Sequence, residues 1–550
     1  MKFIEQLYQK LAEVYSGQKL EEARIAFEEL VEDYSKQTFS ERAPLSEKNV
    51  YLITYGDAFV DGDRKGLSVL KDVVDNKLSD TVTDIHLLPM FPYTSDDGFS
   101  VRDYEQINSI LGDWRDVKRL SDDYRLMFDF VANHMSQSSD WFQKFLNQEP
   151  DFSEAFIKFD EKFDSSNVTR PRVSPLFHTY KNGLKVWTTF SEDQVDVNAQ
   201  EVKMLVRLTK ILLDYAAKGA SSIRLDAIGF LWKESGTTCM HRPQTHAIIQ
   251  LWRLLLEEFA PNTQIITETN VPHKDNVAYF GNGNNEAQQV YQFPLPPLVL
   301  HTFITGNSEK LSGWAKGIEH VSQTASYFNF LASHDGIGLR PTEGILSDEE
   351  RAQLVERVLE NGGKVSYKNN PDGSESVYEM NINFSEALKE GENDKWVTDK
   401  MLAAHHILLS VIGVPAIYYH SIFGSKNDYK GLKESGINRR INREKLDMQQ
   451  LFNSLEDDVY RKEIYQGIQR MIRVRQKEIA FNPYGSQKIL DLGSGCFGVL
   501  REFKGQQIIC VTNVTKEKQT LGDYAGYDLI SERKVQELGV YETVWIKEVR

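Results

Sequence analysis

The stretch SSIRLDAIGF, residues 221–230, follows the run VKMLVRLTKILLDYAAKG, residues 202–219. In the first stretch apolar Ile and Leu alternate with Arg224 and Asp226, which predicts a strand with an Arg–Asp pair on one face. In the second, apolar residues recur every three or four positions, which predicts a helix. A helix that leads directly into a strand is the repeating unit of an α/β fold.

Seven further short apolar runs extend this pattern, and helical stretches separate most of them. Eight strand–helix units in order predict a (β/α)8 barrel, with an open, doubly wound sheet as the alternative. The eight runs are NVYLITYGDAF (49–59), VTDIHLLPMFP (82–92), YRLMFDFVANH (124–134), SSIRLDAIGF (221–230), TQIITETN (263–270), AQQVYQFPLPP (287–297), YFNFLASHDG (327–336) and GVPAIYYHSIFG (413–424).

Four segments fall outside the repeat. The apolar spacing of residues 1–45 predicts an N-terminal helical extension. Residues 137–200 and 337–395 are longer than a barrel loop needs, which predicts inserted subdomains after the third and seventh strands. Residues 481–550 contain short strand-like runs, which predict a small C-terminal β domain. The barrel itself is expected in residues 46–136, 201–336 and 396–480.

Composition restricts the partners. A net charge of -16 over 550 residues argues against nucleic acid and anionic membrane surfaces. No apolar run reaches the length of a membrane span, and the first residues do not form the apolar core of a signal peptide. The chain has 3 cysteines, too few and too scattered for a disulfide framework or a zinc site. We therefore expect a cytoplasmic protein, and leave a homodimer open.

Acidic residues follow several predicted strands at the ends where a barrel builds its active site. Asp226 ends the fourth strand, Glu268 the fifth and Asp335 the seventh. Three acids that share one cleft suit glycosyl transfer, because the reaction needs a nucleophile, an acid/base and a group that stabilises developing positive charge. Four further polar residues lie beside these ends: Asp96, His134, Arg224 and His334.

Four motifs resemble the short regions shared by the α-amylase family of glycoside hydrolases, family 13. The resemblance implies that Asp226 is the nucleophile, Glu268 the general acid/base and Asp335 the transition-state stabiliser. Arg224 would orient Asp226 and keep its pKa low, because a nearby cation favours the charged form. The motifs are DFVANHM (129–135), RLDAIGF (224–230), ITETN (266–270) and LASHDG (331–336).

The chain is more closely similar to the sucrose-phosphorylase subfamily. The N-terminal extension and residues 231–253 resemble its longer branch, which acts on glucosylglycerate or glucosylglycerol. The chain departs from sucrose phosphorylases at Thr169 and Phe230, where they carry Tyr, and at ETN, residues 268–270, where they carry EVH. The motifs that carry the resemblance are LITYGDAF (52–59), LPMFPYTSDDGFSVRDY (88–104), FVANHMS (130–136), TRPRVSPLFHTY (169–180), DQVDVN (193–198), HDGIG (334–338) and INRRINRE (437–444).

This resemblance implies further site residues. Asp96 and Arg443 would hold a terminal glucose, and Phe99 would stack on its ring, while His134 and His334 complete the sugar site. Arg172 in RPR matches the arginine that meets phosphate, a role that suits the bidentate guanidinium. We also expect a carboxylate acceptor such as glycerate to meet a cation after a barrel strand, with two candidates: Arg340 and Arg242.

The sequence therefore predicts a retaining glucoside phosphorylase with inorganic phosphate as co-substrate and no cofactor. The expected reaction is reversible phosphorolysis of a small α-glucoside, 2-O-α-glucosylglycerate in particular, to α-D-glucose 1-phosphate. Sucrose or glucosylglycerol phosphorylase is the first alternative, and an α-glucoside hydrolase or transglycosylase the second. His241 and His246 have no third ligand at metal spacing, so no metal site is expected.

Overall fold

The computed structural model describes residues 2–370 and 373–547. The remaining residues of the predicted N-terminal, second inserted and C-terminal segments lie outside the described residues. Eight parallel strands close into a barrel, which confirms the predicted fold and excludes the open sheet. In order around the barrel they are β1 (Tyr51–Thr54), β3 (Asp84–Leu87), β4 (Arg125–Val131), β9 (Ala220–Asp226), β10 (Gln264–Thr267), β11 (Gln289–Tyr291), β12 (Ser326–Asn329) and β16 (Val414–Tyr418).

The register of the barrel brings charged residues of different strands together. All seven residues of β9 are buried, as expected for a strand covered on both faces. Asp129 on β4 is the register partner of Arg224 on β9, and Val131 is the partner of Asp226. The Arg–Asp face of β9 therefore meets a third charge from the neighbouring strand.

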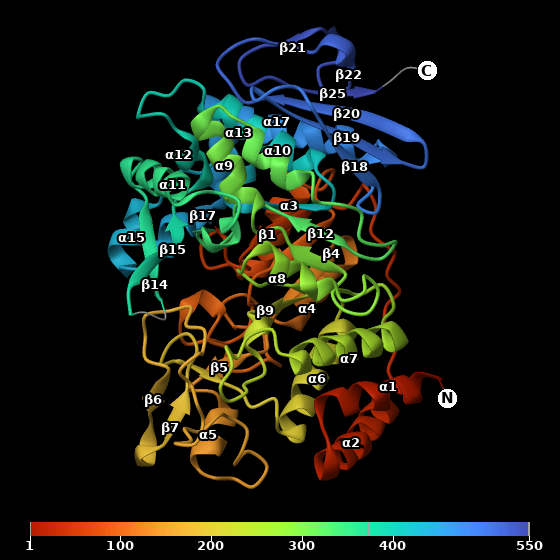
Figure 1. Cartoon of the computed structure of the whole chain (residues 1–550), viewed down its shortest axis with the longest axis vertical. Coiled ribbons are helices and arrows are strands. Elements are labelled where there is room, and N and C mark those ends of the chain that lie inside the picture. The colour runs from red at the N-terminus through yellow and green to blue at the C-terminus, as the bar shows by residue number, and fades with distance from the viewer. Residues whose placement is uncertain (1, 371–372, 548–550) are drawn as a thin grey trace.

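Amphipathic helices surround the barrel (Figure 1). Helix α6, which precedes β9, buries Leu205, Leu208 and Leu212 on one face. This spacing is that of a helix with an apolar stripe against a core. In chain order the longer outer helices are α3 (Gly66–Lys77), α4 (Trp114–Asp123), α6 (Val202–Ala217), α7 (Pro243–Phe259), α9 (Leu295–Thr305), α10 (Glu309–Ala315), α13 (Val397–Ser410) and α17 (Val459–Arg475). Strand β10 is followed by the short α8 (His273–Val277), and β11 is followed by both α9 and α10.

The N-terminal helices α1 (Lys2–Val14) and α2 (Gly17–Ser35) pack on the outside of the barrel, α1 on α7 and α2 on α6. The hydroxyl of Tyr34 donates to Asp214 Oδ1 at 2.6 Å. In Figure 1 the two helices lie at the opposite end of the molecule from the C-terminal sheet. The extension thus buttresses two barrel helices and does not reach the C-terminal sheet.

Two excursions from the barrel approach each other on one side of it (Figure 1). The amide of Asn369 in the second donates to the carbonyl of Val173 in the first at 3.4 Å. The first, after β4, contains β5 (His134–Ser136), α5 (Asp140–Leu146), β6 (Phe177–Thr179), β7 (Lys185–Trp187) and β8 (Gln194–Asp196). The second, after β12, contains β13 (Ile337–Gly338), α11 (Asp348–Glu360), β14 (Lys364–Asn369), β15 (Glu375–Asn381) and α12 (Phe384–Leu388).

The C-terminal part forms an antiparallel sheet against α13. The indole of Trp545 donates to Ser410 Oγ at 2.8 Å, and His406 Nδ1 lies 2.8 Å from Thr512 Oγ1. Across the described ranges, none of the helices is long and apolar enough to cross a membrane. In sheet order the six strands are β18 (Ser486–Leu490), β19 (Cys496–Phe503), β20 (Gln506–Asn513), β25 (Thr543–Lys547), β22 (Gly526–Asp528) and β23 (Arg533–Val535).

Candidate active site

A cavity opens where the barrel strands end and the two excursions meet, with about 1120 Å³ of empty space when the open solvent at its mouth is included. Residues from both excursions complete its wall, so a bound molecule would be enclosed on more than one side. The predicted site residues that line it are Asp96, Phe99, His134, Arg172, Asp226, Glu268, His334, Asp335 and Arg340.

Arg224 fixes the carboxylate at the end of β9. Its Nη1 lies 2.7 Å from Asp226 Oδ1 and 2.7 Å from Asp129 Oδ1, and its Nε donates to the hydroxyl of Tyr291 at 3.0 Å. The side chain of Arg224 is 1% exposed, so these bonds replace all of its water. Arg224 therefore holds Asp226 in one orientation at the floor of the cavity.

Glu268 follows β10 and lies beside the turn after Asp226. Its Oε2 accepts the backbone N–H of Ala227 at 3.2 Å and lies 3.8 Å from Arg224 Nη2. Ala227 has φ 48°, a left-handed conformation that costs energy for a residue with a side chain. The strained turn thus points a backbone donor at the second carboxylate.

Burial dominates the titration of both carboxyls. Burial raises the pKa of Asp226 well above its ordinary value, and the positive charge of Arg224 opposes this rise only in part. Burial likewise raises the pKa of Glu268. The expectation that Arg224 keeps the pKa of Asp226 low is therefore wrong, because removal of water outweighs one cation. Arg224 lies 2.7 Å from Asp226 but 3.8 Å from Glu268, so this cation favours the charged form of Asp226 more than that of Glu268.

Asp335 lies beyond the end of β12 in a different environment. Its Oδ1 is 2.6 Å from Arg439 Nη1, and its Oδ2 is 3.4 Å from His334 Nε2. Burial alone would raise the pKa of Asp335, but the charge of Arg439 and of further arginines lowers it below its ordinary value. Burial, aided by the charge of Arg224, lowers the pKa of His334 well below its usual range, so its ring is neutral. Among the three acids, Asp335 is thus the one whose pKa lies below its ordinary value.

The predicted sugar-binding residues meet on one side of the cavity, with one departure. Phe99 stacks on His334 with ring centroids 4.8 Å apart, and His134 Nε2 lies 3.1 Å from the carbonyl of Phe99. Arg443 Nη1 lies 2.7 Å from Asp97 Oδ2 but 4.0 Å from Asp96 Oδ1. Arg443 is therefore paired with Asp97 and, unlike the other predicted sugar-binding residues named here, is not among the residues that line the cavity.

The three candidate arginines for phosphate or acceptor occupy different places. The guanidinium of Arg172 lies over the ring of Tyr378 at 5.3 Å, inside the cavity. Arg340 also lines the cavity, and no described residue forms a hydrogen bond or ion pair with its guanidinium. Arg242 is ion-paired with Glu234 and is not among the lining residues. The fold thus brings Arg172 and Arg340, but not Arg242, to the cavity.

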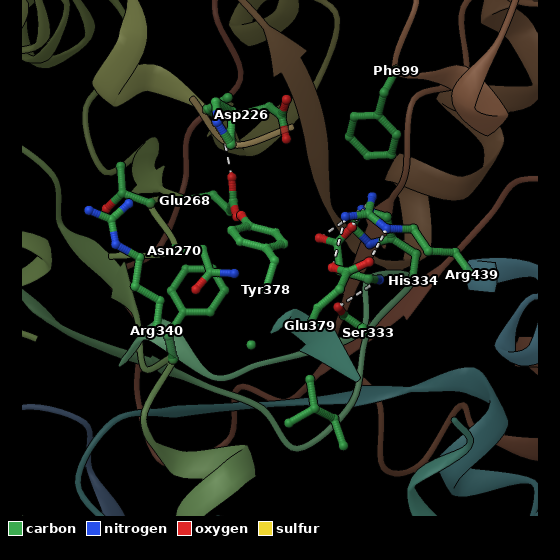
Figure 2. Close-up of a pocket in the computed structure, with 18 of the residues that line it drawn as sticks. Phe99, Asp226, Glu268, Asn270, Ser333, His334, Arg340, Tyr378, Glu379 and Arg439 are labelled. Carbon is green, nitrogen blue, oxygen red and sulfur yellow. Dashed lines mark hydrogen bonds and ion pairs between the residues drawn. The ribbon is translucent and has the colours of Figure 1, made fainter. Parts of the chain in front are cut away.

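Sequence reasoning did not select three residues of the wall: Tyr378, Glu379 and Arg439. Figure 2 shows Arg439, Glu379 and His334 along one side of the pocket, opposite Glu268, Asn270 and Arg340. Arg439 belongs to the quoted motif INRRINRE, which could have indicated it. No local signal marks the other two, because they come from a hairpin strand in the second excursion.

A buried lysine stands where three oxygen atoms converge near the site. Lys233 Nζ lies 2.6 Å from Asp196 Oδ2 and donates to Asn133 Oδ1 at 2.8 Å and to the carbonyl of Phe230 at 2.5 Å. These oxygens join the first excursion to the ends of two barrel strands. Among the described residues, no group of three or more His, Cys, Asp or Glu side chains is placed to hold a metal ion.

The eight-stranded barrel with acids at its strand ends fits the class of enzymes that act on glycosides. The comparisons with known proteins agree with this class. Residues 53–338 match the model of the α-amylase catalytic domain. This chain belongs to the α-amylase family. It is 44% identical to the glucosylglycerate phosphorylase of Escherichia coli strain K12, over 91% of this chain and 92% of that protein. These matches confirm the resemblance to the α-amylase family and to its glucosylglycerate branch.

More distant relatives share the fold. The chain is 31% identical to the sucrose phosphorylase of Bifidobacterium adolescentis, over 72% of this chain and 80% of that protein. The crystal structure of sucrose 6F-phosphate phosphorylase from Thermoanaerobacter thermosaccharolyticum superposes with a TM-score of 0.76 at 24% identity, and covers 90% of this chain and 99% of that one. That structure supports the barrel architecture.

Proposed function

We propose that this protein is a retaining phosphorylase that converts 2-O-α-glucosylglycerate and phosphate into α-D-glucose 1-phosphate and glycerate. Identity of 44% to named glucosylglycerate phosphorylases over nine-tenths of the chain supports both the reaction class and the substrate. The reaction uses phosphate as co-substrate and needs no cofactor.

The three acids divide the first half of the reaction. A carboxylate oxygen of Asp226 attacks C1 of the glucosyl unit, while the protonated carboxyl of Glu268 gives its proton to the departing glycerate oxygen. The bond from C1 to that oxygen breaks, and a β-glucosyl ester of Asp226 forms. Asp335, kept ionised by Arg439, stabilises the positive charge that develops on the sugar ring.

The second half returns the enzyme to its starting state. A phosphate oxygen attacks C1, its proton passes to the carboxylate of Glu268, and the ester bond to Asp226 breaks. Two inversions at C1 give α-D-glucose 1-phosphate with retained configuration. Arg172 lies inside the cavity, where its guanidinium can pair with the incoming phosphate.

The observation that carries the choice of acceptor is the guanidinium of Arg340, which has no hydrogen-bond or ion-pair partner among residues 2–370 and 373–547. It lies on the side of the pocket that holds Glu268, where the leaving oxygen must be protonated (Figure 2). A cation without a carboxylate partner favours an acceptor that brings its own negative charge, and glycerate does so while glycerol and fructose do not. Burial, aided by the positive charge of Arg340, lowers the pKa of Lys368, which places a second cationic side chain near Arg340.

A substrate screen tests the proposal. Purified protein is incubated with phosphate and glucosylglycerate, glucosylglycerol or sucrose, and release of glucose 1-phosphate is followed. We expect glucosylglycerate to give the highest kcat/KM. Sucrose or glucosylglycerol as the best substrate would overturn the acceptor assignment, and glucose release at the same rate without phosphate would indicate a hydrolase.

A further inference from the structure

Asp335 is ion-paired with Arg439, whose positive charge keeps this carboxylate ionised. Arg439 Nη1 lies 2.6 Å from Asp335 Oδ1, while the neighbouring His334 is neutral. In the described part of the chain, Arg439 is the one cation within ion-pair distance of this carboxylate. The orientation of Asp335 therefore depends on the orientation of Arg439.

Arg439 is itself fixed by a buried carboxylate. Its Nε and Nη2 bond to Glu379 Oε1 at 2.8 Å and Oε2 at 2.9 Å, a two-pronged contact that sets the plane of the guanidinium. Glu379 is 2% exposed, and its Oε1 also accepts the amide of Asn381 at 3.0 Å. The guanidinium of Arg439 thus bridges the carboxylates of Glu379 and Asp335. This bridge restricts the rotation of the Asp335 side chain.

The backbone around Asp335 is built to receive Glu379. Strand β13 begins two residues after Asp335 and pairs with β15, with Gly338 opposite Glu379. A Cβ on Gly336 would lie 2.6 Å from Asn381 Nδ2 and 3.0 Å from Glu379 Cδ, so only glycine permits this approach. The segment after Asp335 and the strand that carries Glu379 are therefore packed as one unit.

We propose that Arg439 and Glu379 are a pair of positioning residues that orient Asp335 toward the glucosyl unit. Tyr378, next to Glu379 on the same strand, lines the cavity and lies under Arg172. Strand β15 thus supplies part of the pocket wall through Tyr378 and part of the contact that orients Asp335 through Glu379. The proposal rests on the proposed role of Asp335 in glucosyl transfer.

Substitutions of Arg439 and Glu379 distinguish the effect of the orientation of Asp335 from the effect of the positive charge beside it. Arg439→Met removes the largest of the positive charges that lower the pKa of Asp335, so this pKa rises although other arginines remain nearby. Glu379→Gln keeps the cation but loosens it, so the pKa of Asp335 does not rise. Arg439→Lys keeps the charge without the two-pronged contact. Arg351→Met is the control, because Arg351 on α11 pairs with Asp348 and does not line the cavity.

The assay is fluoride release from α-D-glucosyl fluoride across pH, with circular dichroism to verify folding. Fluoride leaves as Asp226 attacks C1, and water can then take the glucosyl unit from the ester, so the result needs neither glycerate nor phosphate and stands apart from the acceptor assignment. We expect Arg439→Met to lower kcat about 100-fold and to move the acid limb of the profile to higher pH. We expect Glu379→Gln and Arg439→Lys to lower kcat less and to leave the acid limb in place, and Arg351→Met to match the wild type.

Two outcomes would overturn the positioning role. One is a folded Arg439→Met protein with wild-type kcat and an unchanged pH profile. The other is a shift of the acid limb to higher pH in Glu379→Gln as large as in Arg439→Met, which would mean that the two residues do not act in series. A wild-type enzyme that releases fluoride but does not phosphorolyse any tested glucoside would contradict the proposed function alone.

Discussion

Arg224 and Asp226 lie on the same face of β9, and Nη1 of the arginine is 2.7 Å from Oδ1 of the aspartate. The same Nη1 is 2.7 Å from Asp129, so one buried cation is shared by two carboxylates. Asp226 keeps 12% of its side chain exposed, toward the cavity, while Asp129 is enclosed. This arrangement leaves one oxygen of Asp226 available to attack a substrate.

Asp226→Asn should abolish turnover without unfolding the protein. The amide fills the same space and cannot form the glucosyl ester, so we expect a loss of about 10⁴-fold or more in kcat. Phosphorolysis rates and near-ultraviolet circular dichroism check this together. A folded variant that keeps more than a few per cent of wild-type activity would show that Asp226 is not the nucleophile.

Glu268→Gln should slow the enzyme in proportion to how much the leaving group needs a proton. Without a proton donor the glycerate of glucosylglycerate would have to leave as an alkoxide, so turnover of this substrate should fall strongly, whereas α-glucosyl fluoride should be partly spared. Comparison of kcat/KM for the two donors gives the result. An equal loss on both donors would argue against the acid/base role of Glu268.

Arg340→Ala should reduce activity on a charged acceptor most. Loss of a charge-assisted contact worth about 1.5–3 kcal/mol corresponds to roughly ten- to a hundred-fold in kcat/KM for glucosylglycerate. Glucosylglycerol and sucrose have neutral acceptors and should be little affected. Arg242→Ala is the matched control, since Arg242 is paired with Glu234 outside the cavity, and its kinetics should stay at wild-type values. An equal effect of Arg340→Ala on all three donors would assign Arg340 a structural role.

Lys233→Met should destabilise the junction between the first excursion and the barrel. It leaves Asp196, whose side chain is 0% exposed, without its cation, at a cost of about 3–5 kcal/mol. Thermal melting should show a clearly lower Tm. Lys203→Met serves as the reference, because Lys203 and Asp151 are 56% and 67% exposed and their pair contributes about 0–1 kcal/mol. Equal Tm values for the two variants would contradict the structural role of Lys233.

The amino-acid sequence by itself determined the barrel, the family and the three acids. Alternation within residues 221–230 gives a strand, and parallel barrel strands end at a common face. Acids at the ends of separate strands, such as Asp226, Glu268 and Asp335, are therefore expected in one cleft before any contact is known. The family and the phosphorylase relatives predicted from the same motifs agree with the comparisons.

Only the tertiary structure decided which charges meet. Arg340 and Arg242 both follow barrel strands, yet the fold turns one into the cavity and pairs the other outside it. Arg443 is expected at the sugar, yet the fold pairs it with Asp97 and leaves it outside the set of residues that line the cavity. Ion pairs and burial depend on how segments that are distant in the sequence approach each other in space. A short motif does not encode these approaches. For the same reason burial, which no motif records, raises the pKa of Asp226 against the arginine beside it.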